Sequence, residues 1–214
     1  MDEEVTIIDS KTRNEKIKNF FISNMKNLII GFSFIFILVI GYLSMKEMKE
    51  REKIKLAKQF NITTINFKIE GKQRTIDQLT RMINQNDATY SPLALYFLID
   101  NNLIDNKDEI NNLFDQLIKE TSLDEEIKNL IIYKKALFNS EFSTENDLLQ
   151  ILNPIINSES IWKSHSLYLL AEYFYSKNQK QKAKEFFEQI LLLPNANNDI
   201  KIESKKRINR DIGE

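Results

Sequence analysis

Cysteine is absent from this chain of 214 residues, and glycine, proline and histidine are rare. Without cysteine the protein cannot form a disulfide, a thiolate metal site or a cysteine nucleophile. There are four glycines, and no two of them stand within a few residues of each other. Both the P-loop and the dinucleotide-binding loop need clustered glycines where the backbone approaches phosphate, so the composition excludes nucleotide binding by either loop.

The one histidine, His165, has no second metal ligand or base at the spacing of a catalytic motif, and we interpret it as a surface or interface residue. Acidic residues cluster at 124–126, where they would stabilise the positive end of a helix dipole. No catalytic set can be assembled, so we expect no enzyme activity, metal ion, cofactor or small-molecule substrate. The net charge of −1 argues against a nucleic-acid partner.

A long apolar run lies near the amino terminus. Residues 27–45 contain no charged side chain, and as a helix they would span roughly 28 Å, close to the thickness of a bilayer's hydrocarbon core. A cleaved signal sequence fits less well, because a cut after Ser44 would place bulky Tyr42 where a small residue is required. We therefore predict a leader at 1–26 and an uncleaved transmembrane helix at 27–45.

Flanking charge leaves the orientation of that helix open. Four basic residues lie within the fifteen positions before the apolar run, and six lie within the fifteen positions after it. The rule that cytoplasmic flanks are basic is a bias counted over short segments, and here the second basic group is interleaved with glutamates.

Residues 46–214 are predicted to form helices only. The β-branched run 62–69 has no partner strand, and we assign it to a helix that continues the span and turns at 70–72 into a second helix, making a hairpin. Later hairpins are predicted to open near residues 91, 123 and 160. Their spacing of 32 and 37 residues lies on either side of the 34-residue period of a common helical-hairpin repeat.

Polar residues are predicted to cap several of these helices. The caps are Asn106, Ser122 (with Glu125 as its capping-box partner), Ser143 and Ser160. Pro154 is expected to end or kink its helix, and a polar helix from about residue 200 to 211 is expected to close the domain.

The last predicted hairpin resembles a tetratricopeptide repeat. Small Ala171 and Ala183 stand where the two helices of such a hairpin cross closely. The apolar residues around this crossing are Leu167, Leu170, Phe174, Phe187 and Ile190. The preceding hairpin matches less well, because Lys135 and Asn139 occupy positions where apolar residues are expected. The sequence thus predicts an all-α fold, with a single transmembrane helix followed by a tetratricopeptide-like domain at 46–214 that ends in a capping helix.

The whole layout resembles the bacterial ancillary translocon subunit family. The likeness is carried by FFISNMKNLIIGFSFIFILVIGY at 20–42, by ATYSPLAL at 88–95 and by the hairpin from Ala171 to Phe187. The resemblance implies a single-pass protein of the bacterial inner membrane with a cytoplasmic amino terminus and a periplasmic repeat domain. It also implies a scaffold or chaperone-like accessory factor whose partners are translocon subunits, periplasmic chaperones or exported clients. An alternative from another class is an envelope protein that organises cell-wall synthesis or division complexes.

Stacked helical hairpins bind protein partners along an inner wall built from the first helix of each pair. If Ala171 marks the crossing, the residues of the last repeat that face this wall are His165, Tyr168, Glu172 and Tyr175. Tyrosines suit loosely specific capture of polypeptide, so these four are the candidate partner-binding residues. The alternative is that Tyr168 and Tyr175 pack against the preceding repeat. Trp162 is expected to be a structural contact between repeats.

Overall fold

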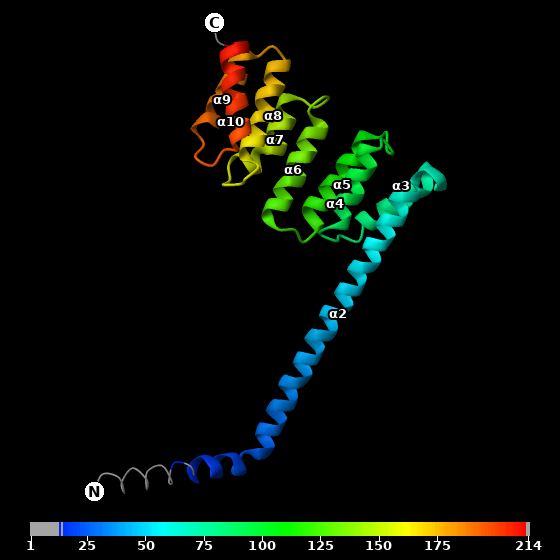
Figure 1. The fold of residues 1–214 in the computed structure, drawn as a ribbon, viewed down its shortest axis with the longest axis vertical. Coiled ribbons are helices and arrows are strands. Elements are labelled where there is room, and N and C mark those ends of the chain that lie inside the picture. Colours follow the sequence, from blue (N-terminus) through cyan, green and yellow to red (C-terminus); the bar gives the residue numbers. More distant parts are fainter. Residues whose placement is uncertain (1–12, 14, 213–214) are drawn as a thin grey trace, which may run out of the picture. The chain divides into compact units, whose positions relative to one another are not determined.

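The computed structural model describes residues 13 and 15–212 (Figure 1). Its contacts divide the chain into two units, one ending at Lys55 and the other beginning at Leu56. The boundary falls inside one long helix, α2, Met25–Glu70. Each unit is therefore described separately.

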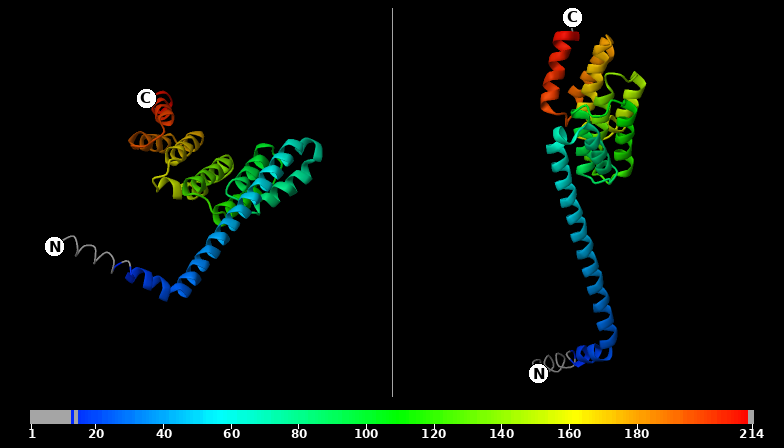
Figure 2. Two further views of the ribbon diagram at one scale, coloured as in Figure 1. Left: turned by 60° about the horizontal axis from the view of Figure 1, so that its bottom comes forward. Right: turned by 90° about the vertical axis from the view of Figure 1, so that its right-hand side faces the viewer.

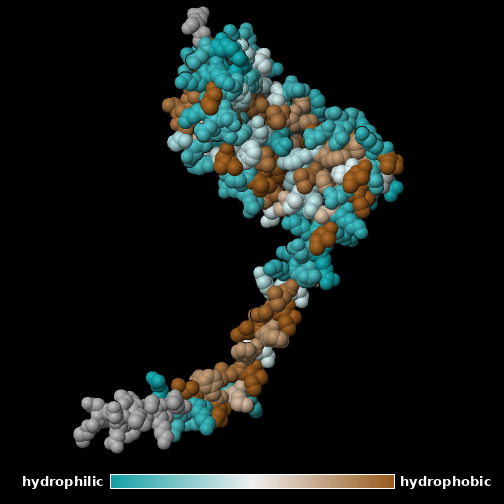
Figure 3. Space-filling model, viewed as in Figure 1, coloured by the Kyte–Doolittle hydropathy of each residue, from teal (hydrophilic) through white to brown (hydrophobic). Residues whose placement is uncertain are grey.

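The first unit is helical at residues 15–23, turns at Asn24 and continues into α2. The segment Met25–Ile69 is long and apolar enough to cross a membrane, and no other helix in the described part of the chain meets that test. Its apolar side chains from Leu28 to Leu43 are exposed, and they form the brown stretch of surface in Figure 3. Charged residues follow, with an ion pair of 2.8 Å between Glu47 and Arg51 one turn apart.

The second unit is a succession of helices in which neighbours along the chain pack against each other (Figure 2). After the end of α2 come α3 (Lys72–Ile83), α4 (Tyr90–Asp100), α5 (Lys107–Glu120), α6 (Glu125–Asn139), α7 (Glu145–Ile156), α8 (Lys163–Ser176), α9 (Lys180–Leu192) and α10 (Asn198–Arg207), followed by the π-helical turn η1 (Ile208–Ile212). No strand occurs in residues 13 and 15–212, and the β-branched run 62–69 is helical. The predictions of an all-helical chain and of a helix near 200–211 are confirmed.

The predicted turn between α2 and α3 is confirmed at Gly71. Its φ of 90° and ψ of 152° lie in a region that residues with a side chain rarely adopt. One residue therefore reverses the chain, and Thr63 donates a hydrogen bond of 3.0 Å to Gln78 across the hairpin.

The predicted caps are partly right. Asn106 caps α5, because its side chain accepts hydrogen bonds from the backbone N–H groups of Asp108 and Glu109. The capping box at Ser122 is wrong: the chain stays extended through Asp124, so Ser122 lies two residues too far from the helix to act as its cap. At α7 the cap is Thr144 rather than Ser143, and Thr144 forms a complete capping box with Asp147.

The start of α8 differs from the prediction, and the end of α7 lies close to Pro154. Ser160 does not cap α8, which begins at Lys163; its hydroxyl instead accepts a hydrogen bond from the Trp162 backbone N–H and donates one to Glu126, at 3.1 and 2.7 Å. Pro154 lies inside α7, which ends two residues later at Ile156.

Buried apolar side chains form two clusters within the described residues. One cluster lies among the end of α2, α3, α4 and α5, with Ile131 of α6, and the other lies among α6 to α9. Ala171 and Ala183 are fully buried in the second cluster, as predicted for a close crossing of α8 and α9. Phe174 and Phe187 are buried beside them.

Candidate partner-binding surfaces

The predicted binding residues all lie on α8, where the structure divides them into two groups. His165 is half-buried beside two rings, with centroid distances of 5.0 Å to Trp162 and 6.0 Å to Tyr133. Burial lowers the pKa of His165 below its ordinary value of 6.5, so the neutral imidazole is favoured at neutral pH.

Tyr168, Glu172 and Tyr175 form the second group: Glu172 and Tyr175 contact Arg207 of α10, and Tyr168 lies beside Glu172. The Arg207 guanidinium donates two hydrogen bonds of 2.7 Å to the Glu172 carboxylate. Its carbon lies 4.2 Å from the centroid of the Tyr175 ring, within the range of a cation–π contact. Burial, and then the nearby Glu172 carboxylate, raise the pKa of Tyr168 to about 12.

These contacts show what the residues do within the chain. Tyr168 and Tyr175 contact elements that follow α8, since Tyr168 also stands 5.5 Å from Phe187 of α9. Both tyrosines also pack against the second cluster, which includes residues of α6 and α7, so the alternative prediction that they pack against the preceding repeat stays a prediction. Arg207 thus already occupies the Glu172 carboxylate and one face of the Tyr175 ring.

Trp162 joins two successive hairpins, as predicted. Its indole N–H donates a hydrogen bond of 3.1 Å to the Glu126 carbonyl, and its ring stacks on Tyr133 of α6 at 5.8 Å. Trp162 thus fixes the start of α8 against α6.

Lys135 and Asn139, the two polar residues that depart from the repeat pattern, lie at a contact between α5 and α6. Asn139 is buried, and its amide exchanges hydrogen bonds of 2.7 and 3.0 Å with the amide of Asn111. Lys135 forms an ion pair of 2.9 Å with Asp115. These polar pairs occupy places that apolar residues fill in a regular hairpin repeat.

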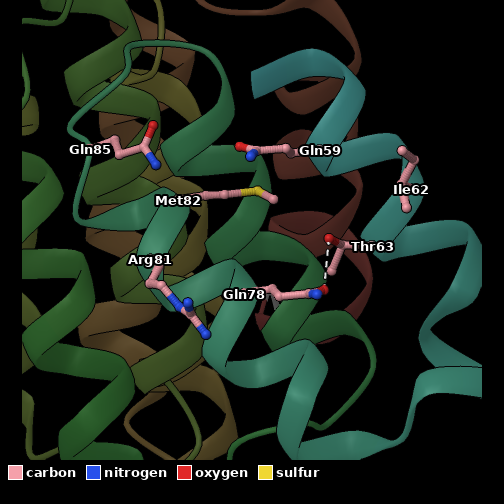
Figure 4. Close-up of a pocket in the computed structure, with 7 residues that line it drawn as sticks. All are labelled: Gln59, Ile62, Thr63, Gln78, Arg81, Met82 and Gln85. Atoms are coloured by element: carbon pink, nitrogen blue, oxygen red, sulfur yellow. Dashed lines mark hydrogen bonds between the residues drawn. The ribbon is translucent and has the colours of Figure 1, made fainter. Parts of the chain in front are cut away.

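A groove that the sequence did not predict lies between the end of α2 and α3 (Figure 4). Its volume is about 320 Å³, and its lining residues are Gln59, Ile62, Thr63, Gln78, Arg81, Met82 and Gln85. Arg81 is the one charged residue among them, and its Nε donates to the Asp77 backbone carbonyl at 3.2 Å. The groove therefore combines amide groups, two apolar side chains (Ile62 and Met82) and one positive charge.

An exposed apolar edge borders this groove. Ile62, Ile65 and Ile69 lie on one side of α2, and their side chains are 46%, 76% and 85% exposed. The opposite face of the same helix carries Phe60 and Phe67, which pack against the first cluster through Phe97 of α4. This part of α2 thus has one apolar face more than the fold itself covers.

Within residues 13 and 15–212, no three histidine or carboxylate side chains gather as they would around a metal ion. Comparisons with protein-family models, with curated proteins and with solved structures found no match. The resemblance to the translocon subunit family therefore rests on the sequence layout alone.

Proposed function

We propose that the protein is a membrane-anchored, protein-binding accessory factor of the secretion translocon, and that its second unit is a tetratricopeptide-like array. In this proposal residues 27–45 span the inner membrane and residues 1–26 stay in the cytoplasm. The helical hairpins then stand in the periplasm, where exported polypeptides emerge.

One observation carries the binding role: the exposed edge Ile62, Ile65 and Ile69 beside the α2–α3 groove. Contiguous apolar side chains at the surface of a charged protein favour a binding site. Glutamine amides in the groove can pair with the backbone of a bound segment, and Arg81 favours a carboxylate in it. The occupant we infer is a polypeptide segment with several apolar side chains and an acidic residue, supplied by an exported client or a translocon subunit.

Site-specific photo-crosslinking in living cells tests this function. A benzophenone amino acid replaces Ile65 in the apolar edge, and in a separate variant it replaces Leu192 of α9. The two side chains are exposed to a similar degree, 76% and 82%, but Leu192 lies away from the groove. We expect Ile65 to crosslink to translocon subunits or to exported chains during their transport, and Leu192 not to do so.

The other outcomes are equally informative. Crosslinks from Ile65 to cell-wall synthesis or division enzymes would replace the translocon role by that of an envelope organiser. Identical products from Ile65 and Leu192, or none from either, would contradict a binding role for the groove. Far-ultraviolet circular dichroism of each variant would show that the helices are intact.

A further inference from the structure

The helical segment at residues 15–23, called here the leading helix, exposes an apolar face that no other described residue of its unit covers. Ile17, Phe20 and Phe21 follow one another at helical spacing, and they are 48%, 58% and 55% exposed. Spacings of three and four residues place all three on one side of a helix. The apolar face is therefore continuous rather than scattered.

The remaining side of the leading helix is mostly polar. It carries Glu15, Lys16, Lys18, Asn19 and Ser23, and Ile22 is its one large apolar residue. From residue 13 to 26 the chain contains four basic residues and one acidic residue. An apolar face flanked by lysines is typical of a helix that lies in the interface of an anionic membrane.

The leading helix ends before the apolar span begins. The Phe20 carbonyl accepts hydrogen bonds from the Asn24 backbone N–H, the Asn24 side-chain amide and the Ser23 hydroxyl, at 3.0, 3.0 and 3.2 Å. The bond from the Asn24 N–H is a regular helical one, as is that of 2.9 Å from the Leu28 N–H to the Asn24 carbonyl, whereas the two side-chain bonds compete with the helical ladder and favour a bend at this point. The turn at Asn24 thus allows the segment to leave the axis of α2.

We propose that the leading helix lies on the membrane surface, with Ile17, Phe20 and Phe21 among the acyl chains and Lys16 and Lys18 at anionic lipid headgroups. The inference rests on the proposed membrane anchor, because the chain enters the hydrocarbon core directly after Lys26. Two features favour a bilayer over a protein as the occupant. The covalent connection holds the helix within a few residues of the bilayer surface, and its basic flanks match the charge of anionic headgroups.

The absence of native cysteine makes a spin-label test direct, because every introduced cysteine is the only one. Single variants of the full chain are placed in vesicles of phosphatidylethanolamine and phosphatidylglycerol: Ile17→Cys, Phe20→Cys and Phe21→Cys for the apolar face, Asn19→Cys and Ser23→Cys for the polar face, and Ile35→Cys for the span. Electron paramagnetic resonance then compares collisions of each label with oxygen, which concentrates in lipid, and with a water-soluble nickel chelate.

We expect oxygen to dominate at positions 17, 20, 21 and 35 and the nickel chelate to dominate at 19 and 23. If positions 17, 20 and 21 behave like 19 and 23 while position 35 remains in lipid, the surface helix is wrong and the anchor stands. If the label at position 35 collides more with the nickel chelate than with oxygen, both the membrane anchor and the surface helix are overturned.

A second measurement tests the role assigned to the lysines. In Phe20→Cys, replacing phosphatidylglycerol by phosphatidylcholine should reduce the preference for oxygen several-fold, and Lys16→Gln with Lys18→Gln should give the same reduction in the anionic vesicles. An oxygen preference that changes in neither experiment would overturn the assignment of these lysines to anionic headgroups.

Discussion

Arg207 on α10 holds the carboxylate of Glu172 on α8 with two hydrogen bonds of 2.7 Å, across 35 positions of the chain. Bidentate pairs of this kind are among the stronger polar contacts in proteins. The pair is mostly shielded from water, with the Arg207 side chain 13% exposed and Glu172 34% exposed. It fastens the last helix over the residues that the sequence assigned to a binding wall.

Arg207→Ala should therefore destabilise the protein by about 2 kcal/mol, because it leaves a partly buried carboxylate without its partner. Thermal unfolding of the full chain in detergent, followed by circular dichroism, measures this as a fall in Tm of roughly 4 to 8 °C. The matched control is Arg210→Ala: Arg210 is 67% exposed and pairs only with its neighbour Asp211 among the contacts described. Equal Tm values for the two variants would contradict a structural role for the Arg207–Glu172 pair.

The lowered pKa of His165 makes stability depend on pH in a defined direction. The folded protein binds the proton less readily than the unfolded chain, whose histidine titrates near 6.5. The stability contributed by the neutral imidazole is therefore complete above pH 6.5, and it is lost as the pH falls through the folded pKa. Nuclear magnetic resonance of this single histidine should give a pKa below 6.5.

His165→Gln is the control for that pH dependence. The variant should lose less unfolding free energy than the original protein between pH 7 and pH 5. The part of this pH dependence that comes from carboxylates should remain. A folded pKa at or above 6.5, or an unchanged loss in His165→Gln, would contradict the burial of this ring beside Trp162 and Tyr133.

The amides of Asn111 and Asn139 should be energetically coupled. Either Asn139→Ala or Asn111→Ala leaves one amide without its partner, at a cost of about 1 to 3 kcal/mol. The double variant should lower the free energy of unfolding by less than the sum of the losses in the two single variants. We expect a coupling energy of about 1 kcal/mol in this double-mutant cycle. Additive effects would mean that the reciprocal hydrogen bonds contribute nothing to the contact between α5 and α6.

Gly71 should tolerate no side chain, although there is space for one. A Cβ at this position would meet no atom within 4 Å, so the cost of Gly71→Ala comes from the backbone φ of 90° alone. We expect a loss of about 1 to 3 kcal/mol in unfolding free energy. Gly41→Ala, inside a regular stretch of α2, is the control and should not lower stability. If the two variants are equally stable, the turn does not require glycine.

Much of the fold follows from local patterns in the sequence. The turn at Gly71, the buried crossing of Ala171 and Ala183 and the cap at Asn106 each depend on residues close together in the chain. Thr144 was missed in favour of Ser143 because adjacent serine and threonine residues are nearly equal as caps. The sequence distinguishes such neighbours poorly.

The contacts that define the surfaces depend on distant partners, and these were not predictable. Asn139 departs from the apolar pattern of the repeat, and the sequence does not show its hydrogen-bond partner because Asn111 lies on another helix, 28 positions away. Tyr175 was assigned to a binding wall, and no residue near it in the sequence indicates that its ring contacts Arg207. The apolar edge did leave a signal: Ile62, Ile65 and Ile69 form a second apolar face on a helix whose opposite face already carries Phe60 and Phe67.

The placement of the helical domain outside the cytoplasm is the claim on which the proposed function depends most. Leu192→Cys tests it directly, because residue 192 is 82% exposed and the chain has no other cysteine. Spheroplasts are treated with a membrane-impermeant maleimide before and after lysis. We predict full labelling of Leu192→Cys in intact spheroplasts, which would place the domain in the periplasm. Labelling only after lysis would place it in the cytoplasm and contradict the translocon proposal.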